Sequence, residues 1–326
     1  MSRVFLCIVV LLLLLSPACN QQFDPREEFQ RKLVVFSILS TDRNMQFARV
    51  EQDYMPADYN PSASTEDKAV SDAIVILRDG NTTYRFADTM FARTDTSRYT
   101  TAIRSYVLRG FIPGFGKTYQ ISASSLSLGT ASATVTVPTN CLLDLSAGAM
   151  GVLDNPASYI ADASIPCYAV LSSLAKGYIG RLYVDYDVLV GSEWQEGRAE
   201  IPLRYLNSQL KVLQDAVFPQ LTSRPTQNQV TAFFKNDLYR AVLSYTANDR
   251  FKGKRIIFKR AVFHVTQVDG NLFSYYNLAH AYLDARSMRL DEPMYSNISG
   301  GYGLVGAYTL DSLVHSLPEN FSYNSR

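Results

Sequence analysis

Charged residues and histidines are both scarce in this sequence, and neither sign of charge dominates. Only 19% of the 326 residues are charged, and 31 Lys and Arg nearly balance 30 Asp and Glu. The first eighteen residues contain one Arg and no acidic residue, so the remainder is formally neutral. Strong nucleic-acid binding needs an excess of positive charge, and we therefore expect no nucleic-acid partner.

The sequence signatures of common catalytic and metal sites are also absent. The three histidines, His264, His280 and His315, are not spaced with one another or with a cysteine as zinc sites require. There is no H-E-x-x-H and no G-x-S-x-G. Gly301–Gly306 has the spacing G-x-G-x-x-G, but a strand-like run follows in place of a helix, which indicates a tight turn into a terminal strand. We expect no cofactor.

Apolar residues are abundant by contrast. The hydrophobic content of 47% suffices for a substantial core and excludes disorder. At roughly 150 residues per domain, the length suggests two domains.

The amino terminus has the features of a secretory signal peptide. One arginine is followed by the unbroken apolar run Val4–Leu15, and the small residues Ser16 and Ala18 precede Cys19. The run is too short to span a bilayer. The sequence therefore predicts a signal peptide over residues 1–18.

Cleavage before Cys19 has two interpretations. Ordinary signal peptidase accepts the small residues before it, whereas lipoprotein signal peptidase requires a cysteine as the new first residue. On the second interpretation Cys19 carries lipid, and residues 19–30 form a polar tether from which the body hangs at a membrane. No later segment indicates a membrane span.

Cysteine usage favours lipidation. Removal of the signal discards Cys7 and leaves Cys19, Cys141 and Cys167 in a compartment where thiols are readily oxidised. If Cys19 is acylated, the other two can close one disulfide. The alternative is that Cys141 and Cys167 are small buried hydrophobes that lie far apart.

The region 31–138 has the pattern of an immunoglobulin- or fibronectin-like β-sandwich. Turn residues separate its apolar runs, and Ala131–Val137 alternates as a half-buried antiparallel strand does. Pro138 ends this strand, and we place the domain boundary there. The seven predicted strands are Leu33–Leu39, Met45–Val50, Ala73–Leu77, Thr83–Phe86, Ser105–Leu108, Thr118–Ser122 and Ala131–Val137.

The region 139–326 predicts an α+β domain. Tyr178–Val190 is typical of a long strand with a hairpin partner at Arg198–Leu206, and Arg255–Val268 of another long strand. Apolar residues spaced by three and four predict a helix over Asn228–Tyr245. A second helix is predicted over Leu272–Arg286. The chain as a whole is expected to be mainly β.

Five segments in this order carry a resemblance to a lipoprotein group: Lys32–Leu39, Ala73–Gly80, Gly116–Ile121, Ala131–Pro138 and Tyr295–Tyr308. The chain resembles Bacteroidetes-type lipoproteins with an uncharacterised domain of unknown function, and the closing Ser-Asn-Ile-Ser-Gly-Gly segment is the distinctive part. The resemblance implies an envelope lipoprotein, lipid-anchored in the outer membrane and often encoded beside TonB-dependent transporters. It implies no catalytic residues.

Two groups of residues are candidates for chemistry or contact. Asp185 and Asp187 lie on one face of a strand about 7 Å apart, which suits a shared calcium ion or paired acid and base, although most such pairs are a solvated sheet face. Trp194, in the glycine-bounded connection Gly191–Gly197, is the best candidate for a contact with a ligand or partner. Its alternative role is to cover a sheet edge.

The segment Asn297–Gly303 is a further candidate, as a constrained loop. Its candidate contact residues are Asn297, Gly300, Gly301 and Tyr302, because glycines allow backbone shapes that other residues resist.

Two classes of function follow from these observations. The first is a non-catalytic accessory or binding lipoprotein, with an outer-membrane transporter as a candidate partner. The second is an envelope hydrolase that acts on glycans through carboxylates such as Asp185 and Asp187. A purely structural subunit of an envelope machine is not separable from the first by sequence.

Overall fold

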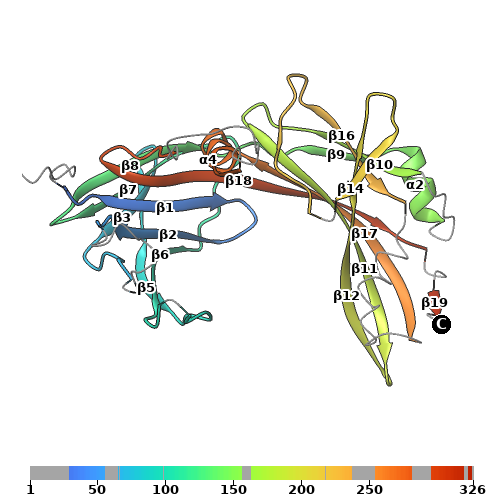
Figure 1. Cartoon of the computed structure of the whole chain (residues 1–326), viewed down its shortest axis with the longest axis horizontal. Coiled ribbons are helices and arrows are strands. Elements are labelled where there is room, and N and C mark those ends of the chain that lie inside the picture. Colours follow the sequence, from blue (N-terminus) through green and yellow to red (C-terminus); the bar gives the residue numbers. More distant parts are fainter. Residues whose placement is uncertain are drawn as a thin grey trace, which may run out of the picture.

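The computed structural model describes residues 29–55, 65, 67–97, 99–155, 163–216, 218–236, 254–280, 295–318 and 322–324. The predicted signal peptide, Cys19 and most of the tether lie outside these residues. The described chain is mainly β, as the sequence predicts, and it forms one long sheet with two smaller sheets (Figure 1).

The long sheet has ten strands and joins the two halves of the sequence. The two halves are joined at β18. This strand pairs antiparallel with β17 of the second half and parallel with β1 of the first half. Its main order is β12 (Glu193–Ile201), β11 (Gly177–Val190), β17 (Arg255–Val268), β18 (Gly301–Ser316), β1 (Leu33–Ser40), β2 (Met45–Gln52), β6 (Ile103–Arg109) and β5 (Ala87–Phe91). Two short strands pair at its sides, β15 (Thr222–Ser223) with β11 and β19 (Ser322–Asn324) with β17.

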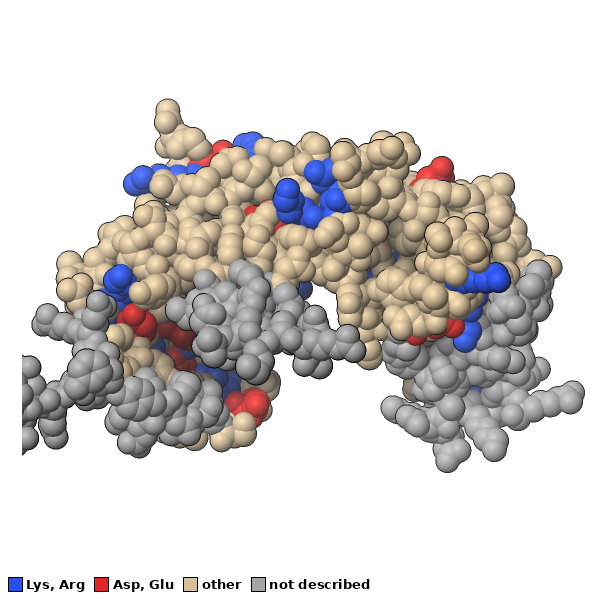
Figure 2. Space-filling view, turned by 45° about the horizontal axis from the view of Figure 1, so that its top comes forward, with Lys and Arg blue, Asp and Glu red and all other residues tan. Residues whose placement is uncertain are grey.

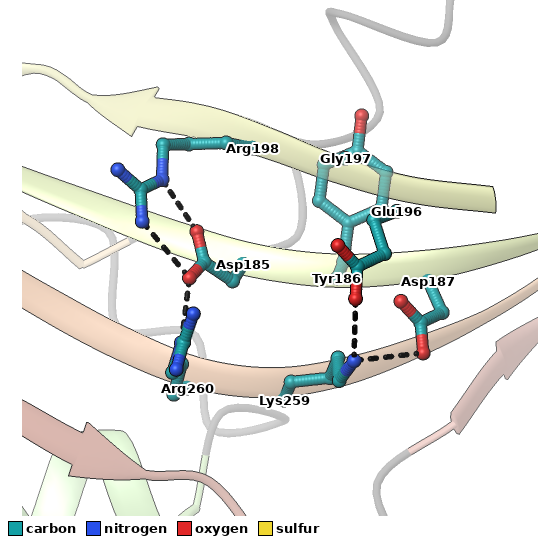
Figure 3. A pocket seen from close by; sticks show the side chains of 8 residues that line it. All are labelled: Asp185, Tyr186, Asp187, Glu196, Gly197, Arg198, Lys259 and Arg260. Atoms are coloured by element: carbon teal, nitrogen blue, oxygen red, sulfur yellow. Dashed lines mark hydrogen bonds and ion pairs between the residues drawn. The ribbon is translucent and has the colours of Figure 1, made fainter.

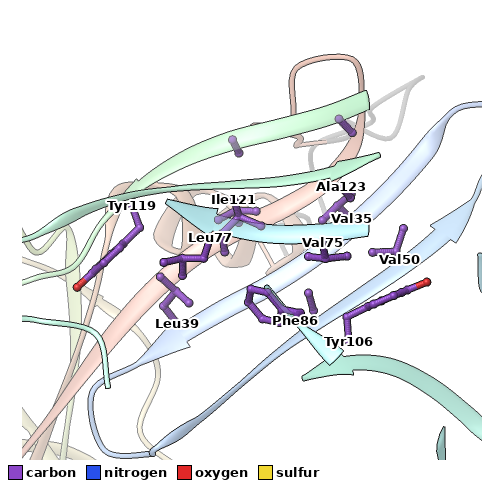
Figure 4. Close-up of a cluster of buried hydrophobic side chains, with 14 of the residues drawn as sticks. Val35, Leu39, Val50, Val75, Leu77, Phe86, Tyr106, Tyr119, Ile121 and Ala123 are labelled. Atoms are coloured by element: carbon purple, nitrogen blue, oxygen red, sulfur yellow. The ribbon is translucent and has the colours of Figure 1, made fainter. Parts of the chain in front are cut away.

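A four-stranded sheet covers the long sheet in the first half. Alternate residues of both layers form a continuous buried core, seen in Figure 4, in which Val35, Leu77 and Ile121 are at most 2% exposed. All seven strands predicted for this half are present, while β5 was not predicted. The order is β4 (Thr82–Arg85), β3 (Ile74–Asp79), β7 (Thr118–Ser125) and β8 (Gly129–Thr136).

A five-stranded sheet covers the long sheet in the second half, and α2 (Ala147–Asp154) packs beside it. Leu182, Phe234 and Phe263 lie in the core between the layers. The order is β14 (Val212–Ala216), β13 (Leu203–Leu206), β16 (Gln229–Lys235), β10 (Ser164–Val170) and β9 (Leu142–Leu145).

The helix predicted over Asn228–Tyr245 is wrong in its described part, because Gln229–Lys235 forms β16. Phe234 is fully buried, with Val230 and Ala232 partly buried against the same core. Positions 230, 232 and 234 have the period of a strand, and antiparallel pairing with β10 satisfies the backbone. Tertiary pairing therefore overrides the helical spacing.

Both smaller sheets cover the same face of the long sheet. Along β18, Val305 and Ala307 belong to the first core, and Leu313 packs on the second. These residues are separated by even numbers of positions, so their side chains point to one face. The domain boundary expected at Pro138 therefore does not separate two independent cores. Strand β18 lies after this boundary in the sequence, yet it contributes to both cores.

The opposite face of the long sheet, here called the outer face, carries α4 (Gly270–His280) near its middle. Leu304 of β18 packs with Leu272, and a Cβ added at Gly306 would lie 3.0 Å from the Leu272 Cβ. Asp269 caps the helix, because its Oδ1 accepts a hydrogen bond from the Leu272 amide at 3.1 Å. The same oxygen accepts from the Ala307 amide of β18 at 3.0 Å and so ties the helix to the sheet. The helix predicted over Leu272–Arg286 is confirmed in its described part.

The two remaining cysteines are not bonded to each other. Cys141 and Cys167 are free and buried. Cys167 lies opposite Leu145 in the β9–β10 pair, so Cys141 is four residues further along, about 13 Å away. A disulfide requires Cα atoms within about 7 Å, so of the two alternatives for these cysteines the structure has the second, in which they are separate buried hydrophobes.

Candidate functional site

The carboxylates predicted from sequence lie in a polar cluster on the outer face of β11, β12 and β17 (Figure 3). Asp185 is bound by two guanidinium groups. Its Oδ1 lies 2.6 Å from Arg198 Nε, and its Oδ2 lies 2.7 Å from Arg260 Nε. Hydrogen bonds from Arg198 and Arg260 lower the pKa of Asp185, despite the opposing effect of burial. The cluster comprises Asp185, Asp187, Glu196, Arg198, Lys259 and Arg260.

Asp187 has its own cation. Lys259 Nζ lies 3.3 Å from both Asp187 Oδ2 and Glu196 Oε1. These two carboxylates raise the pKa of Lys259. The sheet register brings the partners together, because a bulge after Asp185 shifts β17 by one residue and places Lys259 beside Asp187.

This arrangement fits an ion-pair network better than an acid–base pair. A general acid must hold a proton near neutral pH, whereas Asp185 is held ionised by two cations. Among the described residues, no group of three or more His, Cys, Asp or Glu side chains is placed to hold a metal ion. The two aspartates do lie on one face of β11, as predicted, but paired with cations from β12 and β17.

Trp194 lies on the same face as the polar cluster, next to the turn that joins β11 to β12. The turn before it is shorter than predicted: Gly191 and Ser192 form it, and β12 begins at Glu193. Trp194 lies opposite Leu189 in the β11–β12 pair. It is 43% exposed, and the Arg255 guanidinium lies 6.0 Å from the centroid of its ring. It remains accessible, and it does not line the polar cluster described above.

The loop Asn297–Gly303 is held by the protein itself. The Asn297 side chain donates to the Val305 carbonyl at 2.7 Å and accepts from the Val305 amide at 2.9 Å. Gly300 and Gly303 have positive φ, and a Cβ at either position would overlap a carbonyl oxygen, of Thr130 or of Val35. A Cβ at Gly301 would likewise overlap the Leu33 carbonyl oxygen. The prediction of a constrained turn into a strand is confirmed, although β18 is followed by the short strand β19 and is not the terminal one.

Tyr302, the remaining residue predicted in this loop, is 38% exposed and has Lys32 Nζ 5.3 Å from its ring centroid.

A cleft that sequence reasoning missed lies in the middle of the outer face and is here called the α4 cleft. Its volume is about 1090 Å³, slightly above the usual range of ~300–1,000 Å³ for small-molecule sites. Its floor consists of outward side chains from four adjacent strands: Ile179, Thr266, Val268, Tyr308, Leu310 and Ile38. Its walls are α4, through Leu272, Tyr276 and Asn277, and the segment Pro219–Leu221.

Polar groups of the α4 cleft lie mostly at its rim. Asp42 and Arg43 come from the turn between β1 and β2, and Gln220 and Asn277 are exposed. The Asp42–Arg43 ion pair is long, at 3.9 Å, and the Arg43 side chain is 64% exposed. The site therefore combines an apolar floor with one accessible guanidinium.

Only the spacing of outward residues could have indicated this cleft from sequence. Thr266 in β17 and Tyr308 in β18 are partly exposed between buried neighbours, whereas Val268 is itself buried. The strands that carry them come from distant parts of the chain, so their proximity depends on the sheet order β11-β17-β18-β1.

Charged side chains are dispersed over the part of the surface that Figure 2 shows. On the face shown in Figure 2, Lys, Arg, Asp and Glu lie in small groups separated by uncharged residues. This pattern agrees with the near-zero net charge and gives no large field for steering a polyanion.

Helices of the described chain are too short or too polar to cross a membrane. No protein-family model matches the sequence, and no curated protein is significantly similar to it.

Proposed function

We propose that this protein is a non-catalytic envelope lipoprotein that binds a ligand or a partner protein through the α4 cleft. Acylation of Cys19 would hold it at the outer membrane, where a transporter of the TonB-dependent class is the partner that the resemblance implies. In this role the body of the protein is an accessory or binding subunit.

One observation carries the proposal: the apolar floor of the cleft is left open on a sheet whose other face is covered. Ile38 of the floor is 39% exposed, and Tyr276 of the α4 wall is 42% exposed. Leaving apolar surface in water is unfavourable by roughly 25 cal/mol per Å². Contiguous surface of this kind is characteristic of binding sites.

The polar cluster favours binding over glycan hydrolysis. The pKa of Asp185 is lowered, so this carboxyl is a poor proton donor near neutral pH. Asp187 is engaged by Lys259, which also contacts Glu196.

The test compares two substitutions on one strand and one face. Leu310 lies in the α4 cleft, and Val314, four residues further along β18, is 52% exposed outside it. Wild-type, Leu310→Arg and Val314→Arg chains are cross-linked in intact cells and purified from solubilised outer membranes. Leu310→Arg should reduce recovery of the bound molecule at least tenfold, because it buries a charge in the cleft.

Val314→Arg should recover the bound molecule within twofold of wild type. Equal recovery with Leu310→Arg would contradict the cleft as the site. Recovery of no bound molecule from the wild type would contradict the binding function and favour a structural subunit.

A further inference from the structure

The backbone at the centre of the α4 cleft floor is paired within the sheet. Tyr308 of β18 lies opposite Val268 on one side and Ser40 on the other. Thr266 of β17 lies opposite Leu310 on one side and Ile179 of β11 on the other. At these central positions the floor therefore presents side chains to a ligand in place of a free strand edge.

A peptide main chain or a sugar fits such a floor poorly. Each brings several donors and acceptors that would lie over Ile179, Val268 and Leu310, and an unpaired polar group costs roughly 1–3 kcal/mol. The floor provides only the hydroxyls of Thr266 and Tyr308. A hydrocarbon chain brings no polar groups and loses nothing by this contact.

The rim supplies one site of opposite character. Arg43 extends from the turn after β1 and forms a long ion pair with Asp42, whose carboxylate also accepts a hydrogen bond from the Ser40 hydroxyl. A guanidinium binds a carboxylate or phosphate in a bidentate manner, and this one is more exposed than its partner. Gln220 and Asn277 add amide donors at the same rim.

We propose that the α4 cleft binds the hydrocarbon chain of an anionic amphiphile, with the charged head at Arg43. The inference rests on the proposed function, since it names the ligand class of the same site. The head is the carboxylate of a free fatty acid or the phosphate of a phospholipid, which share this chemistry.

The test uses the full chain carrying Cys19→Ser, purified without detergent, and radiolabelled laurate in equilibrium dialysis. Laurate should bind saturably, at about one molecule per chain, and dodecyltrimethylammonium should bind at least tenfold more weakly. A second ligand, lauroyl lysophosphatidylglycerol, distinguishes a phosphate head from a carboxylate head on the same hydrocarbon chain. If it binds more tightly than laurate, the ligand class is phospholipid. If it binds more weakly, the ligand class is free fatty acid.

Three variants locate the site. Leu310→Arg places a charge on the floor, and Ile38→Glu places an acidic group at a position that is 39% exposed, so folding is preserved. Both should weaken laurate binding at least tenfold, whereas Val314→Arg should leave it within twofold. Arg43→Ala should weaken laurate by about two- to fivefold, as expected for an exposed ion pair, and leave uncharged monolaurin unchanged.

Absence of saturable laurate binding would overturn the inference, and so would equal losses with Ile38→Glu and Val314→Arg. The proposed function fails separately. If Leu310→Arg abolishes the cross-linked complex in cells while laurate does not bind, the cleft binds something else and only the ligand class is wrong.

Discussion

The two faces of the long sheet have opposite relations to solvent. The inner face packs against two smaller sheets, and its side chains form two apolar cores with them. The outer face has the polar cluster at one end, where carboxylates and cations neutralise one another, and the α4 cleft in the middle, where apolar side chains stay exposed. The difference teaches that the charged side chains at the end of the outer face are paired with one another, whereas the cleft in its middle is lined mainly by apolar side chains.

The largest effect should come from the inner face. Phe263 is 1% exposed and contacts Phe234 edge-to-face, with ring centroids 5.8 Å apart. Phe263→Ala should lower the free energy of unfolding by about 3–5 kcal/mol, through lost burial and a cavity. Val314→Ala on the outer face should cost within about 0.5 kcal/mol. Urea denaturation measures both, and similar losses would contradict the division between the faces.

The polar cluster should give an intermediate effect. Asp185→Asn removes the charge between Arg198 and Arg260 and should cost about 1–2 kcal/mol at pH 7. Because the folded pKa of Asp185 is lowered, its contribution is present above the unfolded value of ~3.9 and is lost as pH falls through the folded pKa. The difference between wild type and variant should therefore shrink when urea denaturation is repeated near pH 2.5.

Asp187→Asn provides the matched control on the same strand. Asp187 pairs with a single cation, Lys259, at 3.3 Å, whereas Asp185 pairs with two guanidinium groups at 2.6 and 2.7 Å, so the loss should stay within about 0.5 kcal/mol. A loss with Asp187→Asn as large as that with Asp185→Asn would mean that the number of paired cations does not set the contribution of each carboxylate.

The smallest effect concerns the cysteines of the second half. A reducing agent should leave the melting temperature unchanged, because Cys141 and Cys167 are not bonded. Burial raises the pKa of Cys167 to about 12, so its thiolate is scarce at neutral pH. Both thiols should react with a thiol reagent only after unfolding. A melting temperature that falls on reduction would show that the disulfide forms after all.

Part of the candidate site was accessible to sequence reasoning. Asp185 and Asp187 were placed on one face of one strand, and the structure has them there. Their roles were not accessible, because Arg198 and Lys259 lie on neighbouring strands and become partners only through the register and its bulge. The α4 cleft was missed for the same reason, since its floor combines strands from residues 33 to 316.

The sequence by itself determined the local features of this protein. Alternating apolar residues specify strands such as β8 and β17, and glycines mark the loop before β18, because these properties depend on side-chain period and backbone sterics. Only the tertiary structure decided that Gln229–Lys235 is a strand, that β18 joins both cores, and that one apolar stretch stays open beside α4. Pairing between distant strands is a property of the whole sheet, and no short stretch of sequence encodes it.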